Sequence, residues 1–249
     1  MGRELYPAMS GGMRALRSLE VLSNNLANVN TTGYKKDTAV FKLHSPEAAQ
    51  GLPEDSAERR LAEAWSSLDS EYTDFTQGGL RPTGNPMDLA LNGEGFFAVQ
   101  SPDGEVFLTR DGTFQVDAEG FISNTAGLRV LGANSQAIEM PDGEVRIDDA
   151  GVVRVNDQAV GTIGVFDVAD RQALEKVGGN LWTDPDGGAL VPAGAQVRQF
   201  QLEGSNVDAI SALTELIAAS RYYESFKNTL NTSGEMDRQL NVQVGKLDR

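Results

Sequence analysis

Cysteine is absent from this sequence of 249 residues, and histidine occurs once, at His44. Without cysteine the fold can hold neither disulfides nor thiolate metal sites, so the chain suits a reducing or an oxidising compartment equally. A Ser-His-Asp triad would have to use His44, since it is the single imidazole. This residue stands in the polar stretch FKLHSPE, and no Gly-x-Ser-x-Gly motif occurs in the chain. We therefore interpret His44 as a surface histidine.

Long apolar runs are also lacking. No stretch approaches the roughly 20 apolar residues that a membrane-spanning helix needs, so we expect no membrane insertion. The N-terminal stretch MGRELYPAMSGGMRALRSLEVL carries several charges and no uninterrupted apolar core. We therefore expect no cleaved secretory signal peptide. Taken alone, these features predict a cytoplasmic protein, unless the chain uses a different export route.

Positive charge is scarce relative to negative charge. The chain carries 21 lysines and arginines against 36 aspartates and glutamates, which gives a net charge of −15. Binding to nucleic acid or to an anionic membrane surface requires clustered lysine and arginine, so we expect neither as a partner. Hydrophobic residues make up 40% and charged residues 23%, which is typical of a folded soluble protein with one large domain or two modest ones.

No pattern of reactive residues stands above the background. Acidic residues occur mainly in Asp-Gly turns, where carboxylates cap backbone amides, and their spacing selects no acid pair for glycoside hydrolysis. The stretch GEGFF at residues 93–97 opens a strand, whereas a dinucleotide-binding loop follows a strand and opens a helix. DPDGG at residues 184–188 lacks the later ligands of a calcium loop. We expect no catalytic residue, no cofactor and no metal.

What the sequence does contain is a helical pattern at each end. Apolar residues recur every seven positions between residues 5 and 26, and again after residue 205, where Ser205 or Asn206 is the expected N-cap. The small residues Gly12 and Ser23 fill the remaining positions of the first pattern, which would let a neighbouring helix approach closely. The rows of the first helix are Leu5, Gly12, Leu19 and Leu26, and Met9, Leu16 and Ser23; those of the second are Leu216, Tyr223, Leu230, Asp237 and Val244, and Ala219, Phe226, Ser233 and Leu240.

Between the helices, short strand signals alternate with tight turns. FFAVQ, EVFLT, TFQVD, GFISN and RVLG are followed by EVRID, VVRVN, TIGVFDV, NLWTD and QVRQFQLEG. Strands this closely spaced predict an antiparallel meander or a partly closed barrel. The fold class is therefore α+β, in which long N- and C-terminal helices pair as a coiled-coil-like stem beside a central antiparallel β domain.

These signals divide the chain into four parts. We expect the N-terminal helix of the stem over residues 1–33, an extended connector over 34–90, a β-rich outer domain over 91–203 and the C-terminal helix of the stem over 204–249. The connector is polar and rich in glycine and proline, and AERRLAEAW at residues 57–65 could form a short helix within it.

The helical stripes have two interpretations. The two helices could cover one another, or the β domain, within a monomer, which is the commoner use of such stripes. Alternatively, many copies could pack side by side into a helical polymer, in which amides at subunit contacts would make the packing specific. The stretch NNLANVNTTGY at residues 24–34 places several amides on the first helix just before it stops, and amides are mediocre helix formers.

This same stretch carries a resemblance to a known family. LYPAMSGGM and LEVLSNNLANVNTTGYKK resemble the N-terminal signature of flagellar basal-body rod and hook proteins, with Tyr34 where the family usually has phenylalanine. Further blocks follow in the family's order: DFTQGGLRPTGNPMDLALNGEGFFAVQ, LTRDGTFQVDAEGFI, LEGSNVDAI and SRYYESFKNTLNT. The similarity spans nearly the whole chain. The hook protein is usually longer and has outer domains that this sequence lacks.

The resemblance implies a structural subunit and not an enzyme. Members of the family leave the cytoplasm unfolded through the flagellar type III export apparatus, without a cleaved signal peptide. They assemble with other flagellar rod subunits in a helical assembly, the hollow rod that crosses the periplasm and transmits torque. Their terminal helices form the inner tube around the export channel, and the β-rich part faces outward. A chain without cysteine suits export through a reducing and an oxidising space.

On this resemblance, the amides before Gly33 would fix the register between subunits where the chain turns outward. The expected assembly interface comprises Leu5, Met9, Leu16, Leu19, Asn24, Asn25, Leu26, Asn28, Gly33, Leu216, Tyr223, Phe226, Leu230 and Leu240. Two alternatives stay open at this point: another member of the rod or hook family, and, in a different class, a soluble β-rich binding or hydrolytic domain with helical ends.

Overall fold

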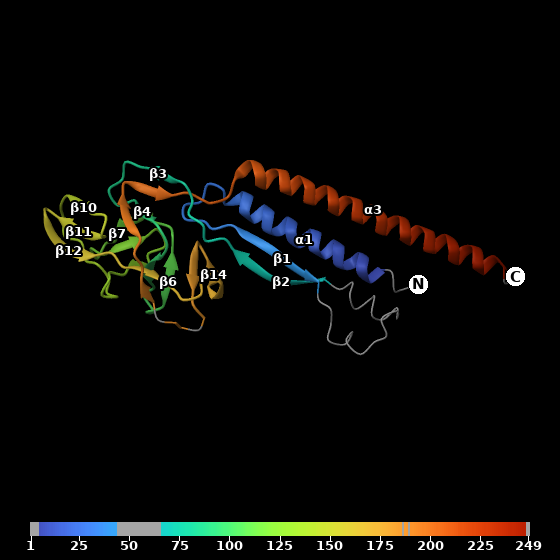
Figure 1. The fold of residues 1–249 in the computed structure, drawn as a ribbon, viewed down its shortest axis with the longest axis horizontal. Helices are drawn as coiled ribbons and strands as arrows, with labels where there is room; N and C mark the ends of the chain where they lie inside the picture. The colour runs from blue at the N-terminus through green and yellow to red at the C-terminus, as the bar shows by residue number, and fades with distance from the viewer. Residues whose placement is uncertain (1–4, 44–65, 186, 189, 248–249) are drawn as a thin grey trace. The chain divides into compact units, whose positions relative to one another are not determined.

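The computed structural model describes residues 5–43, 66–185, 187–188 and 190–247. His44 and the expected helix at 57–65 lie outside these residues. Two long helices and a series of short strands make up the described chain (Figure 1). The elements are α1 (Leu5–Ala27), β1 (Asp37–Leu43), β2 (Ser66–Thr73), β3 (Leu80–Pro82), β4 (Leu89–Asn92), β5 (Phe96–Gln100), β6 (Val106–Thr109), β7 (Phe114–Val116), β8 (Ile122–Asn124), β9 (Arg129–Val130), β10 (Val145–Ile147), β11 (Val152–Val155), β12 (Gln158–Thr162), β13 (Val165–Asp167), the short 3-10 helix η2 (Arg171–Ala173), β14 (Glu175–Gly178), β15 (Leu181–Thr183), β16 (Val191–Pro192), β17 (Gln196–Gln199), β18 (Gln201–Glu203) and α3 (Ala209–Leu247).

The α+β class expected from the sequence is confirmed. Both terminal patterns form helices, and the strand pairs from β3 to β18 are antiparallel. The division of the chain into four parts stays a prediction. The described contacts group the chain into two compact units instead. One, the helical unit, holds α1, β1, most of β2 and α3; the other, the β unit, holds residues 28–36 and 73–207.

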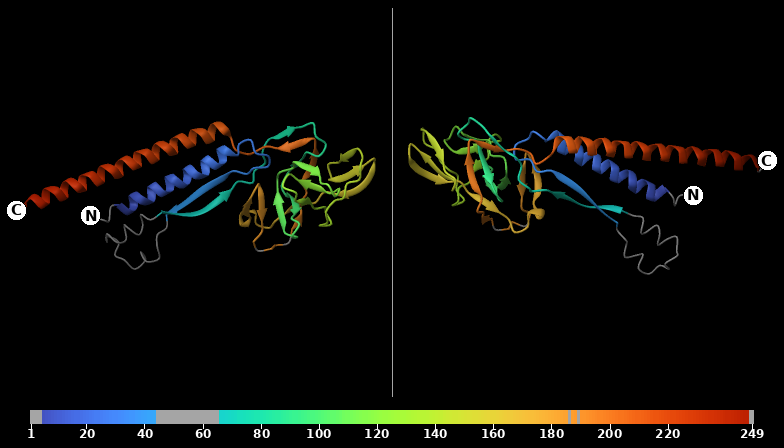
Figure 2. Two further views of the ribbon diagram at one scale, coloured as in Figure 1. Left: turned by 180° about the vertical axis from the view of Figure 1, so that it is seen from behind. Right: turned by 45° about the horizontal axis from the view of Figure 1, so that its top comes forward.

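In the helical unit, α1 and α3 run side by side, and the two-stranded ribbon of β1 and β2 lies along α1 (Figures 1 and 2). The helix α3 has 39 residues and α1 has 23. At 1.5 Å per residue, α3 is about 24 Å longer than α1. Part of α3 therefore extends past any partner that α1 can provide.

The β unit is built around a sheet in the strand order β14-β15-β6-β5-β9-β8-β7, with β13 paired to β5 and to β16. This is not a simple meander, because β9 returns to pair with β5 and β15 pairs with β6 across a long stretch of sequence. Smaller ladders join β10-β11-β12, β4 with β17, and β3 with β18. Residues near the two ends of this unit are thus held together by the last two ladders.

The position of β5 in the centre of the sheet explains why its sequence is a continuous apolar run. Side chains alternate between the two faces of a strand, and here both faces are buried. Phe97 and Val99 lie in one hydrophobic cluster, while Phe96 and Ala98 lie in a second cluster with Trp182. Such a strand shows no polar alternation, since neither face meets water.

Candidate assembly site

The inward face of α3 follows the heptad rows read from the sequence. Its side chains along this face are buried or half-buried, whereas most positions between them are exposed. Spacings of three and four residues place these side chains along one side of a helix. The residues of this face are Ala212, Leu216, Ala219, Tyr223, Phe226 and Leu230.

One close approach fixes the contact between the two helices. A Cβ atom added at Gly12 would lie 2.3 Å from the Phe226 ring, so this ring occupies the space that any larger residue in α1 would fill. Leu19 and Leu26, in the same row as Gly12, are half-buried. The other α1 row differs, because Leu16 is exposed. The side chains of Leu5, Met9 and Leu240 lie outside the described residues.

Among the described residues of the helical unit, further large apolar side chains are exposed. On α3, Ile210 is 79% exposed, and Leu213, Ile217 and Tyr222 are also exposed; on α1, Met13 is 69% exposed. Such residues are costly to leave in water. An open groove of about 440 Å³ runs between the helices beside this surface. It is lined by Arg14, Ala15, Ser18, Ala218, Ala219 and Tyr222.

The three amides of the NNLAN stretch have different surroundings. Asn25 is buried, and its side chain forms two hydrogen bonds with the first residue of β1: Nδ2 donates to the Asp37 carbonyl at 2.7 Å, and Oδ1 accepts from the Asp37 N–H at 2.9 Å. Both polar atoms of this amide are therefore engaged within the chain. Within the chain, the amide holds the ribbon against α1. The expected role of Asn25 in subunit register stays a prediction.

The role of Asn24 and Asn28 in subunit register stays a prediction. Asn24 is exposed, and Asn28 is half-buried just after the end of α1. The Asn28 side-chain oxygen accepts a hydrogen bond from the Thr31 hydroxyl at 3.1 Å, and its carbonyl accepts from the Thr31 N–H at 3.1 Å. Asn28 therefore shapes the turn that follows the helix, as the sequence pattern of a helix stop predicts.

Gly33 occupies a position that only glycine can take. Its φ is +68°, in the left-handed region, and its N–H donates to the Glu203 carbonyl at 2.8 Å. A Cβ atom here would lie 2.4 Å from the backbone nitrogen of Asp111. Both the backbone conformation and the space around it therefore exclude a side chain.

A cluster of three buried charged residues lies beside this turn. We call Lys35, Arg110 and Glu203 the buried charge cluster; all three are almost completely buried. The Glu203 carboxylate accepts from Lys35 Nζ at 2.6 Å, from an Arg110 guanidinium nitrogen at 3.2 Å and from the Gly78 N–H at 2.8 Å. One carboxylate thus connects the segment after α1, the end of β6 and the segment before α3.

The cluster holds two cations and one anion, so its electrostatics are not balanced. Burial lowers the pKa of Lys35 against the opposing effect of the nearby Glu203 carboxylate, and burial also lowers the pKa of Arg110. Hydrogen bonds to backbone carbonyls compensate in part, from Lys35 to Thr76 at 2.7 Å and from Arg110 to Gly93 at 2.9 Å. The sequence alone indicated no role for these residues, although Lys35 and Glu203 stand inside two of the blocks that resemble the family.

The N-cap of α3 differs from the expected one. Asp208 takes this role, since its carboxylate accepts from the Ser211 N–H at 3.1 Å. Asn206 instead connects distant backbone segments within the β unit: its Oδ1 accepts from the Lys36 N–H at 2.8 Å, and its Nδ2 donates to the Asp74 carbonyl at 2.8 Å. The sequence pattern predicted a local role for Asn206 as a helix cap, whereas its hydrogen bonds join segments that are far apart in the chain.

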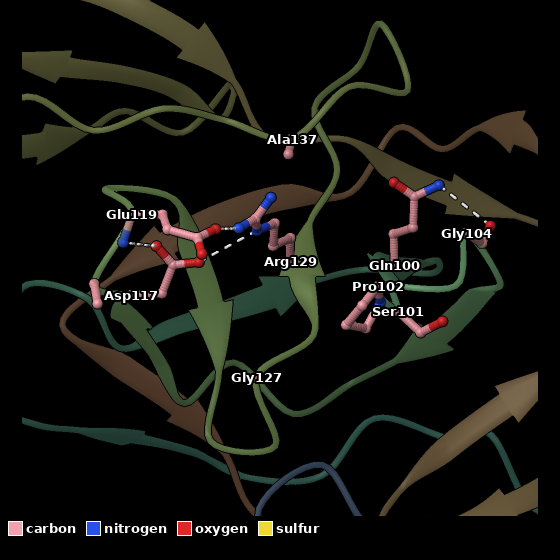
Figure 3. A pocket seen from close by; sticks show the side chains of 10 residues that line it. Gln100, Ser101, Pro102, Gly104, Asp117, Glu119, Gly127, Arg129 and Ala137 are labelled. Carbon is pink, nitrogen blue, oxygen red and sulfur yellow. Dashed lines mark hydrogen bonds and ion pairs between the residues drawn. The ribbon is translucent and has the colours of Figure 1, made fainter.

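The β unit also contains an open pocket of about 580 Å³, which bears on the alternative of a binding or hydrolytic domain (Figure 3). The charged side chains of the pocket point toward one another: Arg129 forms ion pairs with Asp117 and Glu119. Its guanidinium also lies 4.2 Å from the centre of the Phe121 ring. Within the described residues, no group of histidine, cysteine or acidic side chains could hold a metal ion, and no helix is long and apolar enough to cross a membrane. Both acidic side chains of the pocket, Asp117 and Glu119, are therefore engaged by the same arginine.

The fold is of the α+β class, and its paired helices present exposed apolar side chains. Three family profiles match: the flagella basal body rod protein over residues 5–35, the D1 domain of the flagellar hook protein FlgE/F/G over 90–155, and the C-terminal part of the flagellar basal body rod FlgEFG proteins over 198–241. This chain belongs to the flagellar basal-body rod family, whose members are structural proteins and not enzymes.

Individual relatives match over almost their whole length. The flagellar basal-body rod protein FlgF of Caulobacter vibrioides is 34% identical over 251 residues, covering 100% of both chains. The rod protein FlgG of Agrobacterium fabrum is 32% identical, covering 94% of this chain and 96% of the relative. FlgG of Bacillus subtilis is 31% identical, covering 96% and 98%.

Proposed function

We propose that this chain polymerises with other flagellar rod subunits into the hollow rod that transmits motor torque and surrounds the export channel. In this proposal the chain leaves the cell through the flagellar type III export apparatus without a cleaved signal peptide and folds in the periplasm. The helices pair as a coiled-coil-like stem of the inner tube, and the β unit is the outer part. The similarity to FlgF and the LEGSNV block favour the proximal rod as its position, with the FlgG-like distal rod as the alternative.

The uncovered apolar surface of the helical unit carries this proposal. The rows that face between α1 and α3 are buried or half-buried, yet Ile210, Leu213 and Ile217 remain exposed on α3. The helix α1 packs along only one face of α3, so it cannot cover the opposite face. It is also shorter than α3 and cannot cover its full length. Helices from neighbouring subunits would bury these residues, with a gain of about 25 cal/mol for each Å² of apolar surface removed from water.

We propose two roles for other residues of the expected interface. Leu16 and Asn24 are exposed on α1 and would contact a neighbouring subunit, while Leu19, Leu26, Leu216, Tyr223, Phe226 and Leu230 would hold the helix pair itself together. The groove lined by Ala15 and Ala219 would receive an apolar side chain from a neighbouring helix, as in coiled-coil packing.

The test compares export with incorporation. In the variant Ile217→Asp, the change lies at an exposed position, so the isolated subunit should keep its circular dichroism spectrum and reach the culture medium normally. Its recovery in purified basal bodies should fall steeply, because a charge would be buried in a packed contact. The control Asn228→Asp adds the same charge at an exposed polar position of α3 and should reduce recovery far less. Normal incorporation of Ile217→Asp would rule out this face as a subunit contact.

A further inference from the structure

The chain passes between its two units at four peptide links, which form the covalent path for a force between the units. These links join residues 27–28, 36–37, 72–73 and 207–208. Each residue of an extended chain keeps two soft backbone dihedrals, so an isolated connecting segment twists easily. The stiffness of the connection therefore depends on how the ends of these segments are bonded within the β unit.

One amide joins three of the connecting segments. The Asn206 side-chain oxygen accepts a hydrogen bond from the Lys36 N–H at 2.8 Å, and its Nδ2 donates to the Asp74 carbonyl at 2.8 Å. The same nitrogen also donates to the Thr76 carbonyl at 3.2 Å. Asn206, Lys36 and Asp74 each lie within two residues of a link between the units. The amide is therefore bonded where three of the four crossings enter the β unit.

Further contacts hold the same three segments together. Lys35 Nζ donates to the Thr76 carbonyl and to the Glu203 carboxylate, so this side chain also connects all three segments. The Asp74 N–H donates to the Lys36 carbonyl at 2.9 Å, which joins two of the segments directly. We call the three bonded segments the junction, which comprises residues 35–36, 73–76 and 203–206.

The amide of Asn206 bonds connecting segments, whereas a similar amide nearby bonds the sheets. The partners of Asn206 all lie in segments between strands. Gln199 makes the same number of hydrogen bonds: Nε2 donates to the Pro86 and Val145 carbonyls, and Oε1 accepts from the Ile147 N–H. These bonds hold the end of β17 to β10 inside the β unit. Both side chains are half-buried, so the two amides differ mainly in what they connect.

We propose that Asn206 is a positioning residue that stiffens the junction, so that torque passes between the two units of one subunit without twisting the connecting segments. The inference rests on the proposed function, since it assumes a rod that transmits torque. Without the Asn206 donors the segments separate more often, while the strands of the β unit stay paired. The side chain thus acts on the transmission of force and not on the contacts between subunits.

The first experiment measures opening of the junction in the purified full-length chain. The variant Asn206→Asp keeps the shape of the side chain but loses the donor to the Asp74 and Thr76 carbonyls. The backbone amide of Asp74 should therefore exchange its proton about tenfold faster. The matched control Gln199→Glu makes the same chemical change and should leave exchange at Asp74 as it is in the unmodified chain. Equal exchange at Asp74 in the two variants would overturn the inference.

The second experiment compares rotation at low and at high load, in cells whose single copy of the gene carries the change. Both variants should be recovered from purified basal bodies in normal amounts and should swim normally in dilute buffer. In a medium of raised viscosity, Asn206→Asp cells should stop swimming while Gln199→Glu cells still swim like unmodified cells. The variant Asn206→Ala removes the donor without adding a charge and should show the same dependence on load.

Two results would overturn the inference. Reduced recovery of both Asn206 variants from basal bodies would show that the amide serves folding or assembly. An equal response of the Asn206 and Gln199 variants to load would show that the junction does not limit transmission. Either result leaves the proposed function intact as long as the unmodified chain is present in basal bodies. Absence of the unmodified chain from basal bodies would instead overturn the proposed function.

Discussion

Lys35 and Glu203 are separated by 168 residues along the chain, yet the Lys35 Nζ lies 2.6 Å from Glu203 Oε1, and neither side chain is exposed. The first residue follows α1, and the second precedes α3. Glu203 is also the single carboxylate that contacts Arg110 in the buried charge cluster. Both segments that lead to the helices are therefore held at one point in the core of the β unit.

Removal of this carboxylate should strongly destabilise the β unit. The variant Glu203→Ala leaves two buried cations without their anion, and the loss of one partner of a buried ion pair costs about 3–5 kcal/mol. The Trp182 side chain is buried in the same unit, so urea unfolding followed by its fluorescence measures the free energy of unfolding. The control Glu144→Ala removes an exposed ion pair with Arg146 and should cost less than about 1 kcal/mol. Equal losses in the two variants would contradict the importance of the cluster.

A side chain at Gly12 should loosen the helix pair. The variant Gly12→Val places carbon atoms where the Phe226 ring lies, and overpacking of this kind costs about 1–3 kcal/mol. Thermal unfolding followed by the helical circular dichroism signal measures the effect. The second change Phe226→Leu should recover part of the loss, because it removes the atoms that clash. Gly234→Ala is the control, since a Cβ there has open space and should stabilise α3 by up to about 1 kcal/mol.

Substitution of Gly33 should be more damaging than that of another glycine with positive φ. The variant Gly33→Ala combines backbone strain with a clash against the backbone of Arg110 and Asp111, so we expect a loss above about 2 kcal/mol. Gly127→Ala carries the same strain, with φ of +82° and open space around the new Cβ, and should cost about 1 kcal/mol. The measurement compares the free energies of unfolding of the two variants. Similar losses would show that the structure relieves the clash at Gly33 at no cost.

The amide of Asn25 should stabilise the helical unit of a single subunit. The variant Asn25→Leu removes the two hydrogen bonds to the backbone of Asp37, at a cost of about 1–3 kcal/mol. Hydrogen exchange of the amides in α1 and β1 of the monomeric chain measures this loss directly. The exposed residue Asn30 provides the control, and Asn30→Ser should leave exchange nearly unchanged. Unaltered exchange in Asn25→Leu would show that the amide does not stabilise the single subunit and would favour a contact between subunits as its role.

The ion pair of Asp167 with Arg171 should contribute stability that depends on pH. Hydrogen bonds from Arg171, one of them 2.8 Å long, hold the pKa of Asp167 below its usual value. A carboxyl with a lowered pKa in the folded state stabilises the protein above its unfolded pKa and loses this contribution as the pH falls through the folded pKa. The variant Arg171→Gln should therefore be less stable by about 1 kcal/mol at pH 7, and the difference from the unmodified chain should vanish in acid. Urea unfolding at several pH values measures it, and a constant difference would contradict the prediction.

Much of the local structure follows from patterns between near neighbours. The heptad rows predict both helices, and FFAVQ at residues 96–100 corresponds to β5 residue for residue. Seven strands were not predicted, because these segments become strands only where a partner strand supplies hydrogen bonds. They are β1 and β2 in the expected connector, β4 at its end, and the short or exposed strands β3, β12, β14 and β16. The hydrogen bonds of Asn25 within the chain were not predicted, since the residue it binds lies in β1.

The sequence by itself determined the helical ends, the antiparallel class of the β region, the stop of the first helix before Gly33 and membership of the rod family. All of these depend on residues a few positions apart or on short contiguous blocks. Only the tertiary structure decided that Glu203 accepts from Lys35, that Gly12 makes room for Phe226 and that Asn206 joins three connecting segments. The physical reason is that such contacts depend on which distant strands and helices pack together, and that choice is made by the free energy of the whole fold rather than by local preference.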